Sequence, residues 1–455
     1  MTCPGRWLAG LAALVSLGGC TLITDSFLTN EFSGDPFPVH VETSSGAIVV
    51  GLRQTSHPDR EVVLDLLSPI TLIDPGPTTP PSVSFVDLTL LGADATGGAL
   101  IRPRARFIES QLVGVHPCQD ECAADAPDCD PAQCNVGSPA APRAFAGILG
   151  ADVLAGDAVR LRLGDDQLFI LPDVGGSDGG RSRSCESVFT SPYRGGGTMV
   201  IGSTELPFGN RRITLQACLG GDPDPRDQSG IEASLRTRGS DALFVMSTGI
   251  GISIIDETAY QRYLVAGGAP EPIVPGAVYL PSGLVTGHLV HIDRLALVAS
   301  ATSNPQSPCR QIYAHRLLTM HGRIPQEQCA KDGDTADNVT LFDCVCKNDN
   351  DFCDAPAFLE LAPPERIELL VVPDSDPTLQ ALRTELRPDQ AEVDGLLGTN
   401  VLRGAEIDVD YPHDRLIARC TTASCTARPQ LARESDRTQI MGCLRLQPTG
   451  PILPE

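Results

Sequence analysis

Two polar residues, one of them a carboxyl that can transfer a proton, occupy matching places in a segment that occurs twice. Asp65 ends one apolar run and Ser247 ends the other. Two neighbouring carboxyls can share a proton and serve as acid and base together, because their like charges push the two pKa values apart. The hydroxyl of Ser247 does not titrate in that range, so it cannot replace a second carboxylate. The repeat therefore places a titratable carboxyl in its first copy and a hydroxyl in its second.

The repeat extends well beyond these two residues. Residues 63–74 are matched by 245–256, and residues 147–156 are matched by 395–404. Two segments repeated in the same order indicate a duplicated domain. A chain of 455 residues also exceeds what one hydrophobic core usually fills. We therefore expect two lobes built on one plan.

The elements that position these residues are predicted to be mostly strands. The chain has 44 Gly and 38 Pro, and its apolar runs are short, which favours strands and turns over long helices. An alternating run at Ser84–Leu90 is typical of a strand. Helices are indicated only at Glu257–Val265 and Pro377–Leu386, and Asp376 is placed to cap the second. The predicted fold class is mostly β, two-lobed, with few short helices.

The sequence also divides into segments of different character. A hairpin at 158–171, with its turn at Gly164–Asp166, is expected to close the first lobe, and Glu406–Tyr411 mirrors it in the second. Residues 173–198 are rich in Gly, Ser and Arg without periodicity, which is typical of a connector. The predicted organisation is a signal peptide at 1–19, a tether at 20–37, an N-terminal β lobe at 38–172, the connector at 173–198, a C-terminal β lobe at 199–420 with a Cys-rich insertion at 300–360, and a tail at 421–455.

The repeated segments resemble those of the pepsin-like and retropepsin-like aspartic proteases. Each lobe of that family carries an apolar-apolar-Asp-Thr/Ser-Gly loop and a later Gly-apolar-apolar-Gly strand. The resemblance covers roughly residues 38–420 and implies a pepsin-like fold of two β lobes. Matched residue by residue, the family's paired sites fall on Asp65 in the first lobe and on Ser247, Thr248 and Gly249 in the second.

This chain departs from the family pattern in both loops. Leu66 and Leu67 stand where Thr or Ser and then Gly belong, and Ser247 replaces the second carboxylate. The resemblance therefore implies a degenerate protease whose cleft binds a peptide or protein segment without cutting it. Two alternatives stay open: an aspartic-type peptidase or other hydrolase that uses Asp65 in an unpaired mechanism, and a structural envelope lipoprotein with no cleft ligand.

Two further pairs of polar residues occur at matching places in both lobes. Asp74 and Asp256 end their segments and are expected to cap the turn or helix that follows. Asp152 is matched by Asn400, and we expect a local hydrogen-bonding role for both. Because each pair is symmetric, neither is expected to supply the missing carboxylate.

The N-terminus has the features of an export signal. Arg6 precedes a short apolar run, and small residues then lead to Cys20. The run is too short to span a bilayer. The ending resembles the lipobox of bacterial lipoproteins, in which the cysteine is acylated. Cys20 is thus the expected lipid attachment site, and the protein is expected in the cell envelope, anchored to the outer membrane. The alternative is a soluble secreted protein that is cleaved nearby.

Cysteine usage agrees with export. Of the 16 cysteines, Cys3 leaves with the signal and Cys20 carries lipid, so an even number remains. In an exported chain these are expected to form disulfides. A cluster between 118 and 134 lacks the paired C-x2-C arms of a zinc site, which favours disulfides there too. Its members are Cys118, Cys122, Cys129 and Cys134.

Charge and the remaining polar clusters limit the partners. The formal net charge of -23 excludes nucleic acid, which requires basic surfaces. His288 and His291 with Asp293 lack an evident further metal ligand, and the acidic loops at 332–334 and 349–351 do not match a calcium loop. No cofactor or metal is expected. The expected partners are a peptide or protein ligand and a membrane, reached through the lipid; the sequence does not indicate an oligomeric state.

Overall fold

The computed structural model describes four main ranges of the chain. These are 34–109, 146–220, 239–298 and 358–428, with internal gaps of which the longest is 172–186, together with Cys309 and two isolated strands. The predicted signal peptide, Cys20, Asp74 and the cysteines at 118–134 lie outside the described residues. Within the described ranges, no helix is both long and apolar enough to cross a bilayer.

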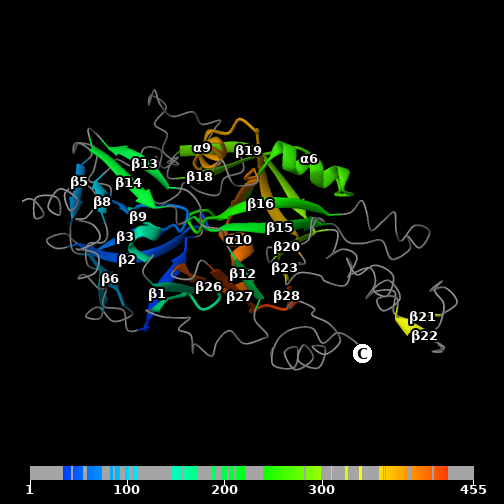
Figure 1. Ribbon diagram of the computed structural model, residues 1–455, viewed down its shortest axis with the longest axis horizontal. Coiled ribbons are helices and arrows are strands. Elements are labelled where there is room, and N and C mark those ends of the chain that lie inside the picture. The colour runs from blue at the N-terminus through cyan, green and yellow to red at the C-terminus, as the bar shows by residue number, and fades with distance from the viewer. Residues whose placement is uncertain are drawn as a thin grey trace, which may run out of the picture.

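The first half of the chain is almost entirely strands, drawn in blue and cyan on the left of Figure 1. We call its described residues, 34–171, the first lobe. Its elements are β1 (Pro36–Val41), β2 (Ile48–Gln54), β3 (Arg60–Leu64), β4 (Leu72–Ile73), β5 (Ser82–Phe85), β6 (Leu88–Leu91), β7 (Gly98–Ile101), β8 (Arg106–Glu109), β9 (Gly147–Leu149), α4 (Ala151–Leu154), β10 (Ala158–Arg162) and β11 (Gln167–Leu171).

The second lobe, residues 212–428, is also mostly strands but carries longer helices. Its elements are β15 (Thr214–Gly220), β16 (Ser240–Met246), β17 (Ser253–Asp256), α6 (Glu257–Val265), β18 (Val274–Leu280), β19 (Gly283–Ile292), β20 (Arg294–Val298), β23 (Phe358–Leu361), β24 (Ile367–Val372), α9 (Pro377–Leu386), β25 (Gly395–Leu397), α10 (Thr399–Leu402), β26 (Ala405–Asp410), β27 (Arg415–Cys420) and β28 (Cys425–Arg428). Three strands precede the second lobe: β12 (Ser187–Thr190), β13 (Gly196–Ile201) and β14 (Thr204–Gly209). Two more strands pair with each other apart from the main sheets: β21 (Arg323–Pro325) and β22 (Asn338–Thr340). The mostly-β, two-lobed class predicted from the sequence is confirmed.

The two lobes repeat one arrangement of strands. In the first lobe β9 lies between β3, to which it is parallel, and β4, to which it is antiparallel. In the second lobe β25 lies in the same way between β16 and β17. The outer neighbours also match, since β4 is parallel to β8 and β17 is parallel to β24. The repeat seen in the sequence is therefore present as a repeat of strand pairing.

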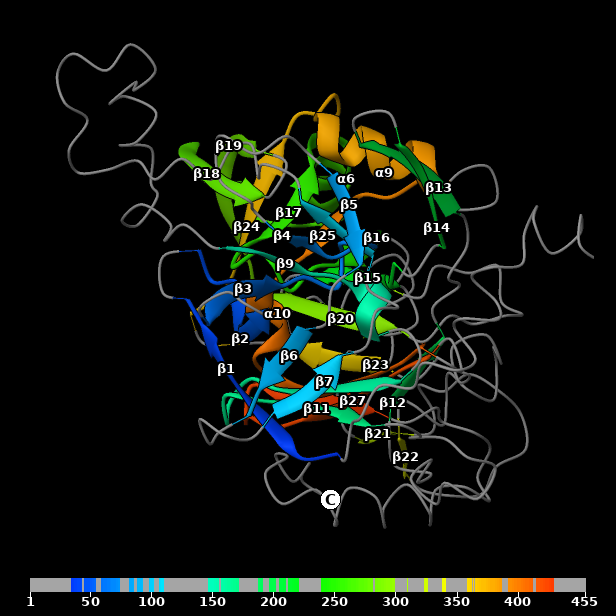
Figure 2. The same cartoon turned by 90° about the vertical axis from the view of Figure 1, so that its left-hand side faces the viewer.

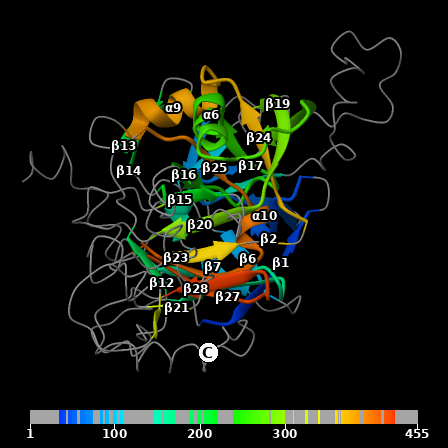
Figure 3. The same cartoon turned by 90° about the vertical axis from the view of Figure 1, so that its right-hand side faces the viewer.

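The hairpins that end the two lobes join in one sheet. β10 pairs with β11 across the turn at Gly164–Asp166, as predicted, and β26 pairs with β27. β10 also pairs antiparallel with β26, so the closing hairpins form a floor shared by both lobes, at the bottom of Figures 2 and 3. β12 extends this floor by pairing with β27. The stretch predicted as a connector thus contributes a strand, which its irregular sequence did not indicate.

Buried charge holds this floor together. Arg160 on β10 donates two hydrogen bonds to Asp408 on β26, at 2.6 and 2.7 Å. The Asp408 side chain is fully buried at the joint between the lobes. Because a buried charge without a partner is strongly destabilising, this contact favours only the observed register of the two strands.

Local predictions agree closely with the structure. α6 and α9 have the predicted bounds, and the Asp376 carboxylate accepts from Thr378 N–H (3.0 Å) and Leu379 N–H (3.1 Å) at the start of α9. The run at Ser84–Leu90, predicted as one strand, is divided between β5 and β6. Two of the expected disulfides lie in the described ranges, Cys218–Cys309 and Cys420–Cys425.

A candidate site between the lobes

Asp65 and Ser247 face each other where the two lobes meet. Each follows the strand of its lobe, and each backbone N–H donates to the neighbouring Gly-apolar-apolar strand: Asp65 to Leu149 O at 3.0 Å, Ser247 to Leu397 O at 2.9 Å. With these equivalent backbone bonds, the side chains of Asp65 and Ser247 meet at the junction of the lobes. The Ser247 hydroxyl donates to Asp65 Oδ1 at 3.1 Å.

The Asp65 carboxyl is almost fully buried among hydrogen-bond donors. Besides Ser247, the N–H groups of Leu67 and Gly249 donate to Oδ1, at 3.0 and 3.2 Å. Burial raises the pKa of Asp65, and this effect exceeds the lowering by these donors and by the charge of Arg212. The residue is therefore suited to hold a proton under conditions in which an exposed aspartate would be ionised.

The hydroxyl that connects the Asp65 loop to the Ser247 loop comes from the second lobe only. The Thr248 hydroxyl accepts from Leu66 N–H (3.0 Å) and donates to Leu64 O (2.6 Å) across the lobe boundary. Leu66 has no hydroxyl to return this bond, and its side chain is instead fully buried in the core. The two hydrogen bonds of the Thr248 hydroxyl therefore hold the Asp65 loop against the second lobe.

A cavity of about 670 Å³ opens over Asp65. Its walls come from the Asp65 loop, from the β18–β19 hairpin and from α9 with the loop before it, and most of the lining is apolar. The lining residues are Asp65, Leu67, Ser68, Pro69, Leu72, Ile148, Arg212, Leu280, Leu284, Val285, Thr286, Pro373, Ser375, Asp376, Pro377, Thr378, Ala381, Leu382 and Glu385. Such a mixture of apolar walls and a few converging polar groups is typical of ligand sites.

One cation, Arg212, is among the residues that line this cavity. Its Nε and Nη2 donate to the two carboxylate oxygens of Glu385 on α9, both at 2.6 Å, and its Nη1 donates to the carbonyl of Leu67 in the first lobe. Arg212 thus links both lobes at the site. This role of Arg212 could not be predicted, because nothing in the local sequence distinguishes it from the neighbouring Arg211.

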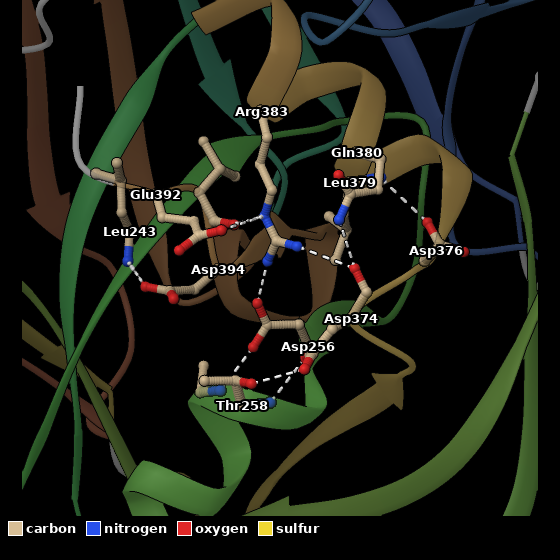
Figure 4. A network of polar contacts seen from close by, with 12 residues as sticks. Leu243, Asp256, Thr258, Asp374, Asp376, Leu379, Gln380, Arg383, Glu392 and Asp394 are labelled. Carbon is tan, nitrogen blue, oxygen red and sulfur yellow. Dashed lines mark hydrogen bonds and ion pairs between the residues drawn. The ribbon is translucent and has the colours of Figure 1, made fainter. Parts of the chain in front are cut away.

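The helix that forms one wall is anchored from its other face (Figure 4). Arg383 on α9 is buried, donates to Val393 O (2.8 Å) and Asp374 O (3.1 Å), and forms an ion pair with Asp256. The Asp256 carboxylate also accepts from Ala259 N–H at 2.6 Å and so caps α6, as predicted. α9 is thereby held by a charge network on the side away from the cavity.

The other polar residues singled out in the sequence have local roles. In the first lobe the Thr71 hydroxyl donates to Asp152 at 2.7 Å, and in the second the Ser253 hydroxyl donates to Asn400 at 2.8 Å. The predicted local hydrogen bonding of Asp152 and Asn400 is therefore observed. His291 lies 3.0 Å from Glu271, far along β19 from the cavity lining.

Comparisons with known proteins give only distant structural matches. No protein-family model matches the chain, and the search of curated proteins found no match. An aspartic proteinase from Irpex lacteus aligns with 85% of this chain and 97% of its own, at 10% identity and a TM-score of 0.35. Basic 7S globulin from soybean aligns with 84% of this chain and 94% of its own, at 10% identity and a TM-score of 0.37. Neither is close enough to assign an activity to this chain.

Substituting Gly249 by alanine should destabilise the protein. A Cβ at this position would stand 2.8 Å from Asp65 Cγ and 2.9 Å from Oδ2, so the buried carboxyl would have to move. We expect Gly249→Ala to lower the free energy of unfolding by about 1–3 kcal/mol, measured by denaturant titration. The matched control is Gly164→Ala, because a Cβ there meets nothing within 4 Å. Equal losses in both variants would contradict the tight packing at Asp65.

Proposed function

We propose that this protein binds an extended peptide or protein segment in the cavity between its lobes and does not hydrolyse it. The observation that carries the proposal is the contact between Asp65 and Ser247. At the place where a paired mechanism needs a second carboxylate, Asp65 meets a hydroxyl 3.1 Å away. Such a site has no second carboxylate to take a proton from the attacking water while Asp65 gives one to the substrate.

The cavity supports peptide binding in size and chemistry. Its walls come from three separate parts of the chain, which leaves room for a segment to lie between them. Apolar side chains such as Leu72, Leu284 and Leu382 offer contacts for apolar residues of a ligand. We therefore interpret the protein as a pepsin-like fold that lacks the paired carboxylates.

The N-terminal sequence supports a location for this function. We propose that Cys20 is acylated after removal of residues 1–19, so that the β lobes are held at the cell envelope, on the outer membrane. Cys20 is preceded by Leu17-Gly18-Gly19 and by a short apolar run. Several acyl chains on one cysteine form a stable anchor, since each buried CH2 contributes roughly 0.8 kcal/mol.

A binding and cleavage assay on the purified full-length protein tests the proposal. The probe is a fluorescein-labelled pool of terminally blocked peptides of about eight residues, which span roughly 26 Å when extended. Leu, Val or Phe alternate in them with Ser, Thr or Gln. We expect saturable binding by fluorescence anisotropy and no fragments by mass spectrometry at acid or neutral pH. Cleavage that disappears in Asp65→Ala would overturn the proposal.

A bulky substitution in the cavity wall should block this binding. Ala381 is an exposed residue of α9 that lines the cavity, and Thr384 is exposed on the same helix but is not part of the lining. We expect Ala381→Trp to weaken peptide binding at least about tenfold, and Thr384→Trp to leave it unchanged. If both variants bind like the wild type, the peptides bind elsewhere on the protein.

A further inference from the structure

The chain between α6 and β18 exposes an apolar surface. Within the described part of the chain, the large apolar side chains that are half or more exposed are Val265 (86%), Ile273 (79%) and Val274 (50%), and all three lie in this stretch. We call residues 265–275 the apolar loop; it joins the elements labelled α6 and β18 in Figure 1. Its other exposed residues carry no charge either: Gly267, Ala269, Pro270, Pro272 and Pro275. Scattered exposed apolar side chains are ordinary, but several in one segment are typical of an interaction surface.

The single charged residue of the apolar loop is turned away from solvent. Glu271 is the only acidic or basic residue between Arg262 and His288. Its Oε2 accepts from the backbone N–H of His291 at 2.8 Å and lies 3.0 Å from His291 Nδ1, while its Oε1 forms an ion pair with Arg366. The Glu271 side chain is 17% exposed. The loop therefore presents apolar side chains to solvent while its carboxylate is bound from behind.

The apolar loop is also held firmly against α6. The N–H groups of Gly267 and Gly268 donate to the carbonyls of Leu264 and Tyr263, at 3.1 and 3.0 Å. A Cβ at Gly268 would stand 2.4 Å from Cε1 of Tyr263, so the loop packs directly on that ring. The three prolines of the loop fix further backbone angles. Because little conformational freedom is lost when such a segment is bound, the surface is preorganised for contact.

We propose that the apolar loop is the contact through which two copies of this chain form a weak dimer. The net charge of -23 makes two copies repel each other over most of their surfaces. At the apolar loop they can approach without bringing like charges together, and an apolar patch is complementary to itself across a two-fold axis. The loop has 11 residues, from 265 to 275. A stable interface uses about 20–30 residues on each side, so this dimer is expected to be weak and reversible.

Two other occupants fit the apolar loop less well. A membrane surface favours Trp, Phe or Leu together with Lys or Arg, and the exposed residues of this loop include none of these. An added strand would pair with β18, which lies at one end of its ten-stranded sheet. Pro272 and Pro275 have no N–H to offer such a strand, which is how natural sheet edges are protected from pairing. Side-chain packing between two copies uses the groups that the loop does present.

Sedimentation velocity of the purified full-length protein, with no peptide added, tests the proposal. We expect a reversible monomer–dimer equilibrium with a micromolar Kd. This Kd should fall as salt is added, because salt screens the repulsion between the two copies. An interface made of ion pairs would show the opposite salt dependence and would contradict the proposal. Ile273→Asp brings a carboxylate from each copy into the contact and should raise the Kd at least about tenfold.

Ala423→Asp is the matched control. Ala423 is exposed in the turn before β28, outside the apolar loop, and the substitution adds the same charge. We expect this variant to dimerise with the wild-type Kd, and both variants to unfold at the wild-type urea concentration, because both side chains are exposed.

Association through an acylated N-terminus would be the same in all three proteins, so equal Kd values in them would overturn the inference. A wild type that stays monomeric up to about 300 µM would also overturn it. If the retention of that monomer on phosphatidylcholine vesicles fell in Ile273→Asp, the loop would be assigned to a membrane instead. Peptide binding in the cavity should be equal in all three proteins, so these outcomes are independent of the proposed function.

Discussion

Arg383→Met should lower the free energy of unfolding by about 3–5 kcal/mol at neutral pH. The side chain is 4% exposed, and its ion-pair partner Asp256 is 3% exposed. Methionine matches the length of the arginine stem but leaves the Asp256 carboxylate buried and unpaired. Burial already raises the pKa of Asp256, and the charge of Arg383 opposes that rise. Equilibrium denaturation by urea at several pH values measures the effect.

The pH dependence of this loss has a definite sign. Without Arg383 the pKa of Asp256 in the folded protein rises further above its value in the unfolded chain. The unfolded chain then releases the proton more readily, so stability is lost as the pH rises through the folded pKa. The loss caused by Arg383→Met should therefore be largest at neutral pH and smaller in acid, where Asp256 is protonated.

Two controls separate the unpaired charge from lost packing. Arg262 contacts Asp394 at 2.5 Å in the same network, but its side chain is 45% exposed, so Arg262→Met should cost no more than about 1 kcal/mol. Adding Asp256→Asn to Arg383→Met removes the buried charge and should recover much of the loss at neutral pH. Similar losses for Arg383→Met and Arg262→Met would show that the buried pair does not anchor α9.

Ser247→Asp should make the protein unstable at neutral pH without creating an acid protease. Ser247 is fully buried, and its hydroxyl lies 3.1 Å from Asp65 Oδ1. A second carboxyl there would share one proton with Asp65 and raise the pKa of the pair. Because the unfolded chain releases those protons more readily, we expect a loss of about 2–4 kcal/mol as the pH rises from acid to neutral. The neutral variant Ser247→Asn is the control and should show little of this pH dependence.

Activity is not expected from this single change, because the first loop also departs from the protease pattern. Leu66 cannot return the hydroxyl bond that Thr248 supplies, and Leu67 fills the place of a glycine beside the cavity. The triple variant Leu66→Thr, Leu67→Gly and Ser247→Asp introduces the aspartic-protease motif into both loops and is the version to assay for cleavage of the peptide pool. Robust pepstatin-sensitive cleavage by Ser247→Asp alone would show that the first loop is competent as it stands.

The sequence by itself determined the features that depend on near neighbours or on the repeat. α9 begins and ends where Asp376, Pro377 and the apolar spacing indicate, since a helix cap needs only backbone groups two or three residues away. The repeated segments predicted that Asp65 and Ser247 hold equivalent places, because two copies of one motif fold alike. The sequence alone therefore showed that a carboxyl in the first copy corresponds to a hydroxyl in the second.

Only the tertiary structure decided what surrounds these residues. Arg212 and Glu385 are 173 positions apart, and their ion pair beside the cavity depends on how the second lobe folds. Long-range contacts also decide the pairing of β10 with β26 and the strand β12 in a stretch with no strand pattern. Burial of Asp65, which raises its pKa, also arises from packing between distant segments. Such contacts cannot be predicted from local sequence. Their free energy comes from removing the groups from water and bringing distant residues together, which happens only when the lobes have folded.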